Sequence, residues 1–367
     1  MRVRLGDYIK EYSVKNKNNE DIPVYSVSNS LGFCKDYFGK EVASKNKTTY
    51  KIVPRGCFAY NPSRINVGSV DWQNEEERVI VSPLYNVFSV SPLLDQQYLL
   101  YYLKSNVTLA RIKAVASGSV RDNLKLSMLY EFPIDLVSLD QQYEIVSILN
   151  AVQKIIDLYQ KELSGLDELV RARFVEMFGD LRVNDKDWKY YKLDELTELI
   201  TDGEHATPKR TTQGIYLLSA RNVLNHQLSL EDVDYIDYDE FSRISRRIVP
   251  REGDVLISCS GSIGRCCVVP KNIKFQMVRS VALLRFKPNV NPIFAEYMIT
   301  SDYLQDQINK SKTASSQANL FQGKIKSLKG VVPPLELQNQ FASFVEEIDK
   351  SRLLSNHSLS LIKTITF

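Results

Sequence analysis

Residues 253–265 read Gly-Asp-Val-Leu-Ile-Ser-Cys-Ser-Gly-Ser-Ile-Gly-Arg, a short apolar run that leads into a loop of glycines and small hydroxyl groups. Such a loop can hold a nucleophilic serine, cradle a phosphate or bring its backbone close to a large ligand. A nucleophile elbow needs Gly-x-Ser-x-Gly, but Gly261 follows Ser260 immediately. A P-loop needs Lys-Ser or Lys-Thr after its glycines, and none follows here. Two interpretations stay open: a loop whose N–H groups and Arg265 lie against a nucleic-acid phosphate, and a plain glycine turn.

Other residues that could carry catalysis form no convincing site. The chain has three histidines without a pattern, and its five cysteines form no Cys-x-x-Cys pair, so we expect buried thiols rather than zinc. Asn61-Pro62 matches the start of the Asn/Asp-Pro-Pro-aromatic motif of adenine amino-methyltransferases, but Ser63 and Arg64 follow and no glycine-rich cofactor loop is evident. We find no nuclease carboxylate–lysine cluster and no Walker motif. We therefore expect no catalytic, cofactor or metal site in this chain.

The bulk composition sets wide limits. At 367 residues the chain is long enough for two or more domains, and its formal net charge is only +3. Nucleic acid is neither demanded nor excluded, and any basic patch must be local. The first residues carry no signal-peptide pattern, and no stretch approaches the roughly 20 apolar residues of a membrane span. We expect a soluble cytoplasmic protein.

The chain repeats itself at an offset of 196 residues. Ile-Val-Pro-Arg occurs at 52–55 and 248–251, and Gly68 falls on Gly264. Residues 98–105 fall on 294–301, 123–124 on 319–320, and 145–149 on 341–345. Five matches at one offset indicate an internal duplication. Each half has a β-rich block with apolar runs such as 80–87 or 282–286, a helical stretch (about 94–116 and about 292–311), a polar loop and a long helix.

The long helices are the clearest structural pattern. From about 139 to 178 apolar residues alternate at spacings of four and three, which is typical of a coiled coil. The second helix starts near 335 and is interrupted at Arg352 and Ser355 before Leu359 and Ile362 resume the pattern. We expect the two helices to pack antiparallel with one globular block at each end. The alternative is that each helix packs only on its own domain. The stripe residues are Ile145, Leu149, Val152, Ile156, Tyr159, Leu163 and Leu166 in the first helix, and Phe341, Val345 and Ile348 in the second.

The predicted fold class is α+β: two similar β-rich globular domains separated by two long antiparallel coiled-coil helices, related by a pseudo-two-fold internal repeat. The expected bounds are 1–137 and 181–334 for the domains, and 138–180 and 335–367 for the helices. Two similar modules on a spacer suit a protein that recognises two DNA half-sites at a fixed distance.

The whole chain resembles the specificity (S) subunit of type I restriction-modification systems. The resemblance lies in Tyr-Leu-Leu-Ser-Ala-Arg-Asn at 216–222, Gly-Asp-Val-Leu-Ile-Ser at 253–258 with Gly-Ser-Ile-Gly at 261–264, Pro-Pro-Leu-Glu-Leu-Gln at 333–338, and Phe-Val-Glu-Met-Phe-Gly-Asp at 174–180. The first half departs from this pattern, because its counterpart loop at 56–68 is longer and lacks Gly-Asp.

The resemblance implies a non-catalytic subunit whose domains each recognise half of a bipartite double-stranded DNA site. It implies that the long helices dock methyltransferase (M) subunits, with two as the expected number, and that restriction (R) subunits join the full complex. S-adenosylmethionine would then be bound by the methyltransferase partner. A different class of function is a two-headed coiled-coil scaffold without a DNA role, which the near-neutral charge favours.

Side chains suited to DNA readout are Arg and Lys for guanine and phosphate, and Asn and Gln for adenine. In the first half the candidates are Asn29, Lys45, Lys47, Asn61, Arg64, Asn66, Arg121 and Asn123. In the second half they are Lys209, Arg210, Arg221, Asn222, Arg246, Arg247, Ser260, Ser262, Arg265, Gln317 and Asn319. The alternative for each is an ordinary polar loop of a soluble protein.

Overall fold

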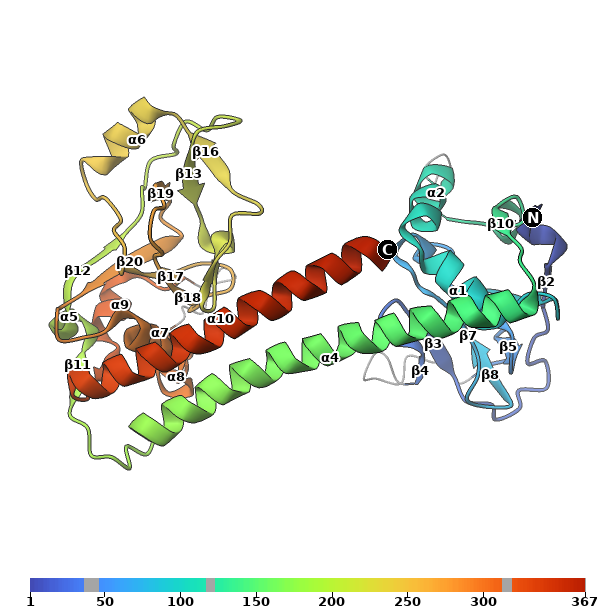
Figure 1. The fold of residues 1–367 in the computed structure, drawn as a ribbon, viewed down its shortest axis with the longest axis horizontal. Coiled ribbons are helices and arrows are strands. Elements are labelled where there is room, and N and C mark those ends of the chain that lie inside the picture. Colours follow the sequence, from blue (N-terminus) through green and yellow to red (C-terminus); the bar gives the residue numbers. More distant parts are fainter. Residues whose placement is uncertain (36–45, 117–122, 312–318, 367) are drawn as a thin grey trace. The chain divides into compact units, whose positions relative to one another are not determined.

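The computed structural model describes residues 1–35, 46–116, 123–311 and 319–366 (Figure 1). The chain divides into two compact units, one of Met1–Tyr159 with Ser358–Phe367 and one of Gln160–His357. No described helix is long and apolar enough to cross a membrane.

The first unit is built around a four-stranded antiparallel sheet. Its strands are β2 (Ile9–Glu11), β9 (Asn86–Val90), β6 (Phe58–Tyr60) and β7 (Val70–Trp72), in that spatial order. A hydrophobic core that includes Phe58 and Phe88, whose rings stack 5.0 Å apart, joins this sheet to the helices that follow it. These helices and the strand after them are α1 (Gln96–Lys104), α2 (Asn106–Ala116), α3 (Leu126–Leu129) and β10 (Pro133–Asp135), which pairs with β1 (Arg2–Arg4).

The second unit repeats this architecture. Its main sheet has strands β12 (Thr197–Asp202), β20 (Val281–Phe286), β17 (Val255–Ser258) and β18 (Cys266–Val268), again all antiparallel and in the same relative order. The following elements are α7 (Pro292–Thr300), α8 (Asp302–Ser311), α9 (Gln322–Ser327) and β21 (Lys329–Val331), which pairs with β11 (Tyr190–Lys192), itself followed by α5 (Leu193–Leu196). The duplication inferred from sequence is therefore present in the strand order as well.

The two units differ in the strands outside the main sheet. The first has the hairpin β3–β4 (Tyr25–Ser28, Gly32–Lys35) and the pair β5–β8 (Lys51–Pro54, Arg78–Val81). The second has a three-stranded sheet, a short hairpin and one helix: β13 (Ile215–Leu218), β14 (Val223–Leu224), β15 (Gln227–Leu228), β16 (Asp234–Ile236), α6 (Tyr238–Ser245) and β19 (Phe275–Met277). The modules thus share a frame and diverge at its periphery.

One expectation needs correction, and one part of the repeat differs in structure. The run 80–87 is not one strand but the end of β8 and the start of β9, because Pro83 in the intervening turn has no N–H to donate. The repeated Ile-Val-Pro-Arg lies in β5 in the first copy but outside any strand in the second. Both copies then reach a glycine with positive φ, Gly56 at 83° and Gly253 at 80°, which Cys57 follows in the first copy and Asp254 in the second.

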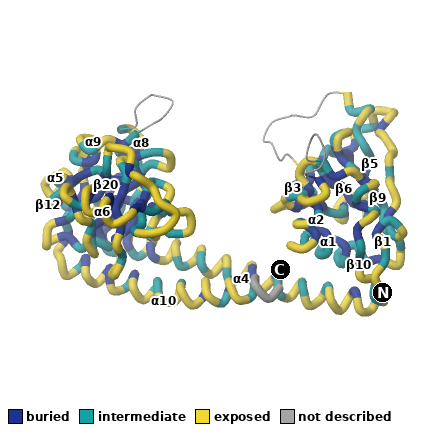
Figure 2. The backbone as a smooth tube through the Cα atoms, turned by 90° about the horizontal axis from the view of Figure 1, so that it is seen from above, coloured by how far each residue is buried: buried dark blue, intermediate teal, exposed yellow. Residues whose placement is uncertain are grey.

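The long helices are α4 (Leu139–Phe178) and α10 (Leu335–Thr366), which match the predicted ranges. Within the second unit they pack antiparallel: Arg352 of α10 bonds Asp167 of α4 at 2.6 Å, and Ser355 lies 3.3 Å from Glu162. The predicted stripe is buried or half-buried from Leu149 onward. Figure 2 shows buried and half-buried positions alternating with exposed ones along α4. Ile145 departs from it with 36% exposure.

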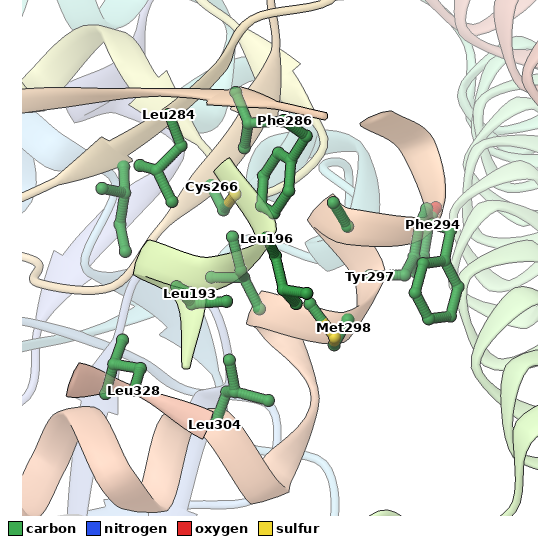
Figure 3. Packing of buried hydrophobic residues seen from close by; sticks show 14 of the residues in the cluster. Leu193, Leu196, Cys266, Leu284, Phe286, Phe294, Tyr297, Met298, Leu304 and Leu328 are labelled. Atoms are coloured by element: carbon green, nitrogen blue, oxygen red, sulfur yellow. The ribbon is translucent and has the colours of Figure 1, made fainter. Parts of the chain in front are cut away.

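An aromatic cluster joins both helices to the second module. Phe174 and Phe178 of α4 contact Phe341 of α10 at ring distances of 5.4 and 5.5 Å, and both contact Phe294 of α7. Figure 3 shows Met298 of α7 beside Leu193 and Leu196 of this core, and Phe294 and Tyr297 of the same helix on the side away from these leucines. The helices therefore pack on the module and on each other through one continuous core, so the alternative of separate packing is not what the second unit adopts.

Replacing Phe341 by alanine should destabilise this junction. The side chain is fully buried, and removing such a ring costs about 3–5 kcal/mol. The free energy of unfolding measured by urea denaturation should fall by that amount in Phe341→Ala. Leu354→Ala on the same helix is the control, because Leu354 is 72% exposed and its loss should change stability by about 0.5 kcal/mol or less. Equal effects of the two substitutions would contradict the packing described.

A buried carboxylate lies on α7, where the β14–β15 hairpin meets it. Glu296 is 5% exposed, and its Oε1 lies 3.3 Å from Nδ1 of His226, whose ring stacks on Tyr297 at 4.0 Å. Burial raises the pKa of Glu296 above its ordinary value of 4.5, and the nearby His226 opposes this only in part. Because the folded state binds the proton more tightly than the unfolded chain, the contribution of Glu296 to stability is greatest below pH 4.5 and is lost as the pH rises through the raised pKa.

Glu296→Gln should therefore be more stable than the wild-type protein at neutral pH and equal to it below pH 4.5. The amide keeps the size of the side chain but cannot ionise. The measurement is the free energy of unfolding of both proteins across pH, with Glu346→Gln, an exposed carboxylate of α10, as the control. If the difference between wild type and Glu296→Gln did not change with pH, the burial argument would fail.

Candidate nucleic-acid interface

A polar cleft of about 450 Å³ lies in the first module, on the loop that follows β6. It is lined by the backbone and side chains of two segments far apart in sequence, 26–30 and 61–69, together with Tyr85. Four of the residues predicted to contact DNA line it: Asn29, Asn61, Arg64 and Asn66. The structure thus brings together candidates that the sequence separates by more than thirty positions.

Local hydrogen bonds give this loop its shape. The Asn61 side-chain oxygen accepts from the Ser63 N–H at 3.1 Å and from the Ser63 hydroxyl at 2.9 Å, which forms an Asx turn. Gly68 has φ 89°, and a Cβ there would lie 2.7 Å from Oδ1 of Asn29. Only glycine lets Asn29 approach the loop this closely. Across the described residues no hydrogen bond or ion pair engages the guanidinium of Arg64, which is exposed at the cleft.

The second module has a cleft of about 480 Å³ at the corresponding loop. Ser260 and Asn319 line it and form a β-bridge with each other. The same backbone contact fixes the polar loop in both modules: the Leu320 N–H donates to the Cys259 carbonyl at 2.9 Å, and the Leu124 N–H donates to the Pro62 carbonyl at 3.0 Å. That contact also holds the half-buried Asn123 beside the first loop.

Hydrogen bonds of one serine give the glycine-rich loop after β17 its shape. The Ser258 hydroxyl, fully buried, donates to the Ser262 carbonyl at 2.6 Å and accepts from the Arg265 N–H at 2.9 Å. Gly261 and Gly264 have φ of 66° and 87°. Ser258 is therefore a structural residue, while Ser262 is exposed and Arg265 half-exposed.

His205 lines the same cleft but does not form a nucleophile–base pair. Its Nε2 lies 2.7 Å from Asp202, and no hydrogen bond within the described ranges connects it to Ser260. Burial raises the pKa of Asp202, but hydrogen bonds from Arg247 and His205 outweigh this effect and hold the pKa below its ordinary value. The carboxylate therefore remains ionised at neutral pH and compensates the charge of Arg247.

Several predicted basic contacts are already paired within the protein. Arg247 bonds Asp202 at 2.7 Å, and Arg210 and Arg221 both contact Asp234, at 3.0 and 3.1 Å. Although burial opposes it, bonds from Arg210 and the charge of Arg221 lower the pKa of Asp234. These arginines carry little uncompensated charge toward a phosphate.

Asn222 is not accessible to a DNA ligand in this structure. Its side chain is 1% exposed, and its amide donates to the Ser229 and Asp232 carbonyls while its oxygen accepts from the Ser219 N–H. Because these hydrogen bonds occupy both the amide and the oxygen of Asn222, this side chain has little capacity to recognise a base. Asn222 instead stabilises the loop after β13.

The remaining predicted DNA contacts lie away from the two clefts or outside the described residues. Lys47 lies 3.6 Å from Asp21 and does not line the cleft of the first module. Lys209 and Arg246 are exposed at the surface of the second module but do not line its cleft. Lys45, Arg121 and Gln317 lie outside the described residues.

Two residues of the second cleft were absent from the sequence prediction. Arg279 is exposed at the cleft, and its guanidinium has no hydrogen bond or ion pair among the residues that the structure describes. Phe321 is a 59% exposed aromatic residue at the same cleft. The residues at the equivalent positions of the first module do not indicate that Arg279 or Phe321 contacts a ligand. Arg279 and Ser280, however, directly precede the apolar run 281–286, so the sequence does show a polar strand end there.

The helix positions predicted to contact a partner are divided between two faces. Ile156, Phe341 and Val345 are buried within the chain itself. Exposed apolar side chains of α4 instead include Ile148, Ile155 and Leu158, with exposures of 57%, 44% and 58%. Among the described residues no group of three His, Cys, Asp or Glu side chains is arranged to hold a metal. Cys57, Cys259, Cys266 and Cys267 are buried free thiols, as expected, and Cys34 is half-buried.

Comparison with known proteins gives consistent matches. A family model described as the type I restriction modification DNA specificity domain matches residues 4–168 and again residues 185–364. A putative type I restriction enzyme MjaX specificity subunit of Methanocaldococcus jannaschii is 26% identical over 172 residues, which covers 45% of this chain and 40% of that protein. The putative specificity subunit S.HindORF215P of Haemophilus influenzae is 24% identical over 287 residues, covering 72% of this chain and 66% of the relative. The matches thus span less than two thirds of either relative.

Two solved structures share the fold. One is a chain from a structural study of complex assembly and conformational transition of the type I R-M system, with 14% identity and a TM-score of 0.59, covering 100% of this chain and 95% of the other. The second is the type I restriction-modification S subunit from M. genitalium, with 13% identity and a TM-score of 0.53, covering 100% and 93%. None of these comparisons supports a coiled-coil scaffold without a DNA role. Because the family model matches both halves, the chain belongs to the family of type I restriction-modification DNA specificity subunits.

Proposed function

We propose that each module of this chain recognises one half of a bipartite DNA site through its polar cleft. The observation that carries this proposal is that each module has a cleft at the repeat-equivalent loop, the one after β6 in the first and the one after β17 in the second, and that a leucine N–H, of Leu124 or Leu320, holds this loop in each module. The opposite wall differs, because it is formed by residues 26–30 in the first module and by residues 279–282 and 319–322 in the second. In each module the cleft presents asparagine and an arginine without an acidic partner among the described residues, Arg64 in the first and Arg279 in the second. These are the groups that recognise bases and hold phosphates.

The charge distribution is consistent with local rather than global attraction. The net charge is only +3, and three of the predicted arginines of the second module are neutralised by aspartates. Arg64 and Arg279 therefore carry much of the uncompensated charge at their clefts. A protein of this kind binds DNA through a few well-placed contacts instead of a broad basic surface.

In this proposal, partner subunits carry out the catalytic functions of the complex. The chain itself contributes no catalysis; methyl transfer with S-adenosylmethionine is carried by M subunits, two in number, and cleavage by R subunits. The exposed apolar side chains of α4 offer a surface on which an M subunit can dock. The long helices set the spacing between half-sites, and the assembly acts in the cytoplasm.

The experiment that tests this function is a methylome of the host with and without this gene, obtained by single-molecule sequencing. We expect a split motif, with two short defined parts around an unspecified spacer, that disappears on deletion. An unchanged methylome while the partner methyltransferase is expressed would refute the proposal.

Arg64→Ala and Arg279→Ala should each weaken binding of the assembled complex to its specific DNA by about 1–3 kcal/mol, which is about 5-fold to 150-fold. If the contact is to a phosphate, the salt dependence of the binding constant should also become shallower by about one unit of slope. The measurement is fluorescence anisotropy with labelled duplexes over a salt series.

Lys271→Ala is the matched control for this pair, because Lys271 is exposed, pairs with Glu252 at 3.5 Å and does not line the cleft. It should leave the specific binding constant unchanged. Binding of Arg64→Ala and Arg279→Ala with wild-type affinity would exclude these clefts as DNA contacts.

A further inference from the structure

A buried glutamine ties the start of α4 to the first module. Gln142, in the first turn of the helix, is fully buried. Its Oε1 accepts from the Asp95 N–H at 2.8 Å, and its Nε2 donates to the carbonyls of Leu93 at 3.0 Å and Val137 at 2.9 Å. Asp95 is also the N-cap of α1, where its side chain accepts from the Tyr98 N–H. One side chain therefore connects the sheet-to-helix loop, the start of α1 and the segment before α4.

The same arrangement recurs in the second module. Gln338 of α10 is fully buried, its Oε1 accepts from the Asn291 N–H at 2.8 Å, and its Nε2 donates to the carbonyls of Asn289 at 3.2 Å and Pro333 at 2.7 Å. Asn291 is the N-cap of α7. Each of the three bonds has its counterpart at the repeat-equivalent position, so the contact is reproduced bond for bond.

Neighbouring side chains support both junctions. The Tyr101 hydroxyl donates to Asn150 of α4 at 2.7 Å, and the Asn291 amide donates to Asn339 of α10 at 2.9 Å. These bonds are exposed and water can replace them, whereas the glutamine bonds are inaccessible to water. A buried amide that must satisfy one backbone donor and two backbone acceptors permits few directions of the helix relative to the module.

Beyond the junction, each helix continues without a break. α4 runs over 40 residues, a length of about 60 Å, and the glycine within it, Gly165, keeps helical geometry. A change of direction at the first turn of a rod this long is amplified at its far end. The helix direction set by Gln142 or Gln338 therefore affects the position of the far end of the helix, in addition to local stability.

We propose that Gln142 and Gln338 are positioning residues that fix the direction of each long helix on its module and thereby determine which spacer length between the two half-sites is accepted. This inference rests on the proposed DNA-reading function. One extra base pair moves a half-site by about 3.4 Å along the duplex and rotates it by about 35°. A stiff junction rejects that displacement, and a loosened junction tolerates it.

The test uses the complete complex of this chain with its M partner and duplexes that carry both half-sites. The duplexes have the natural spacer or a spacer one base pair shorter or longer. The variants are Gln142→Ala and Gln338→Ala. Glu144→Ala and Gln340→Ala are the matched controls, because both positions are exposed, lie two residues further along the same helices and are repeat equivalents.

We expect the ratio of methylation on the natural spacer to that on the altered spacers to fall by about tenfold in each glutamine variant. The controls should keep the wild-type ratio. Amide hydrogen exchange at Asp95 or Asn291 should also accelerate, since their N–H groups lose a buried acceptor. Gln142→Met and Gln338→Met keep the approximate size of the side chain and remove the three bonds without burying a charge, so they should lower the ratio as well and serve as the test if the alanine variants fold poorly.

Uniform loss of methylation on all three duplexes, with the ratio unchanged, would assign the glutamines a purely structural role and overturn the inference. An unchanged ratio with wild-type activity would also overturn it. If the wild-type complex itself showed no methylation of any bipartite duplex, the proposed function would fail instead, so the two failures are distinguishable.

Discussion

The buried amide in the first turn of each long helix is the interaction on which the rest of the architecture depends. Without Gln142 and Gln338 the N–H groups of Asp95 and Asn291 and four backbone carbonyls would lose a buried partner. Hydrophobic contacts cannot supply this constraint, because they are non-directional and tolerate sliding. The aromatic cluster around Phe341 provides much of the adhesion between helix and second module, whereas the glutamine specifies its direction.

Duplication explains which features stayed and which changed. The strand order of the main sheet, the glutamine contact and the leucine N–H that holds the polar loop are the same in both modules. Interactions that only stabilise one module differ. In the second, Asp254 is 2% exposed and pairs with Arg285 at 2.7 Å, while the residue after the equivalent glycine in the first module is Cys57. The peripheral sheets differ most, and in a protein that recognises two half-sites these are the parts that are free to acquire different preferences.

Features with a regular period or a repeat could be predicted from the sequence. The ranges of α4 and α10 and the clustering of Asn61, Arg64 and Asn66 follow from local pattern. The break of each shorter helical stretch into two helices, α1 and α2 or α7 and α8, was not expected from the sequence. The ion pairs could not be predicted, since Arg247 meets Asp202 across 45 positions and the partner of a loop arginine depends on tertiary structure. Ile145 was assigned to the stripe because it is apolar and correctly spaced, yet the polar Gln142 takes the inward place at the start of the helix. An apolar pattern does not detect a buried amide whose partners are backbone groups.

Most arginines of the second module are paired with acidic side chains, and this pairing affects how the module can bind DNA. A cationic group already bonded to an aspartate gains little from a phosphate, because the approach of the anion also brings it near the carboxylate. Binding to random DNA is dominated by phosphate contacts, so internal compensation at Arg210, Arg221 and Arg247 weakens it more than it weakens a contact made through Arg279 in a specific cleft. In a DNA-reading subunit this arrangement raises the ratio of specific to non-specific binding. The modest net charge is then a property that supports sequence recognition rather than one that argues against DNA as the ligand.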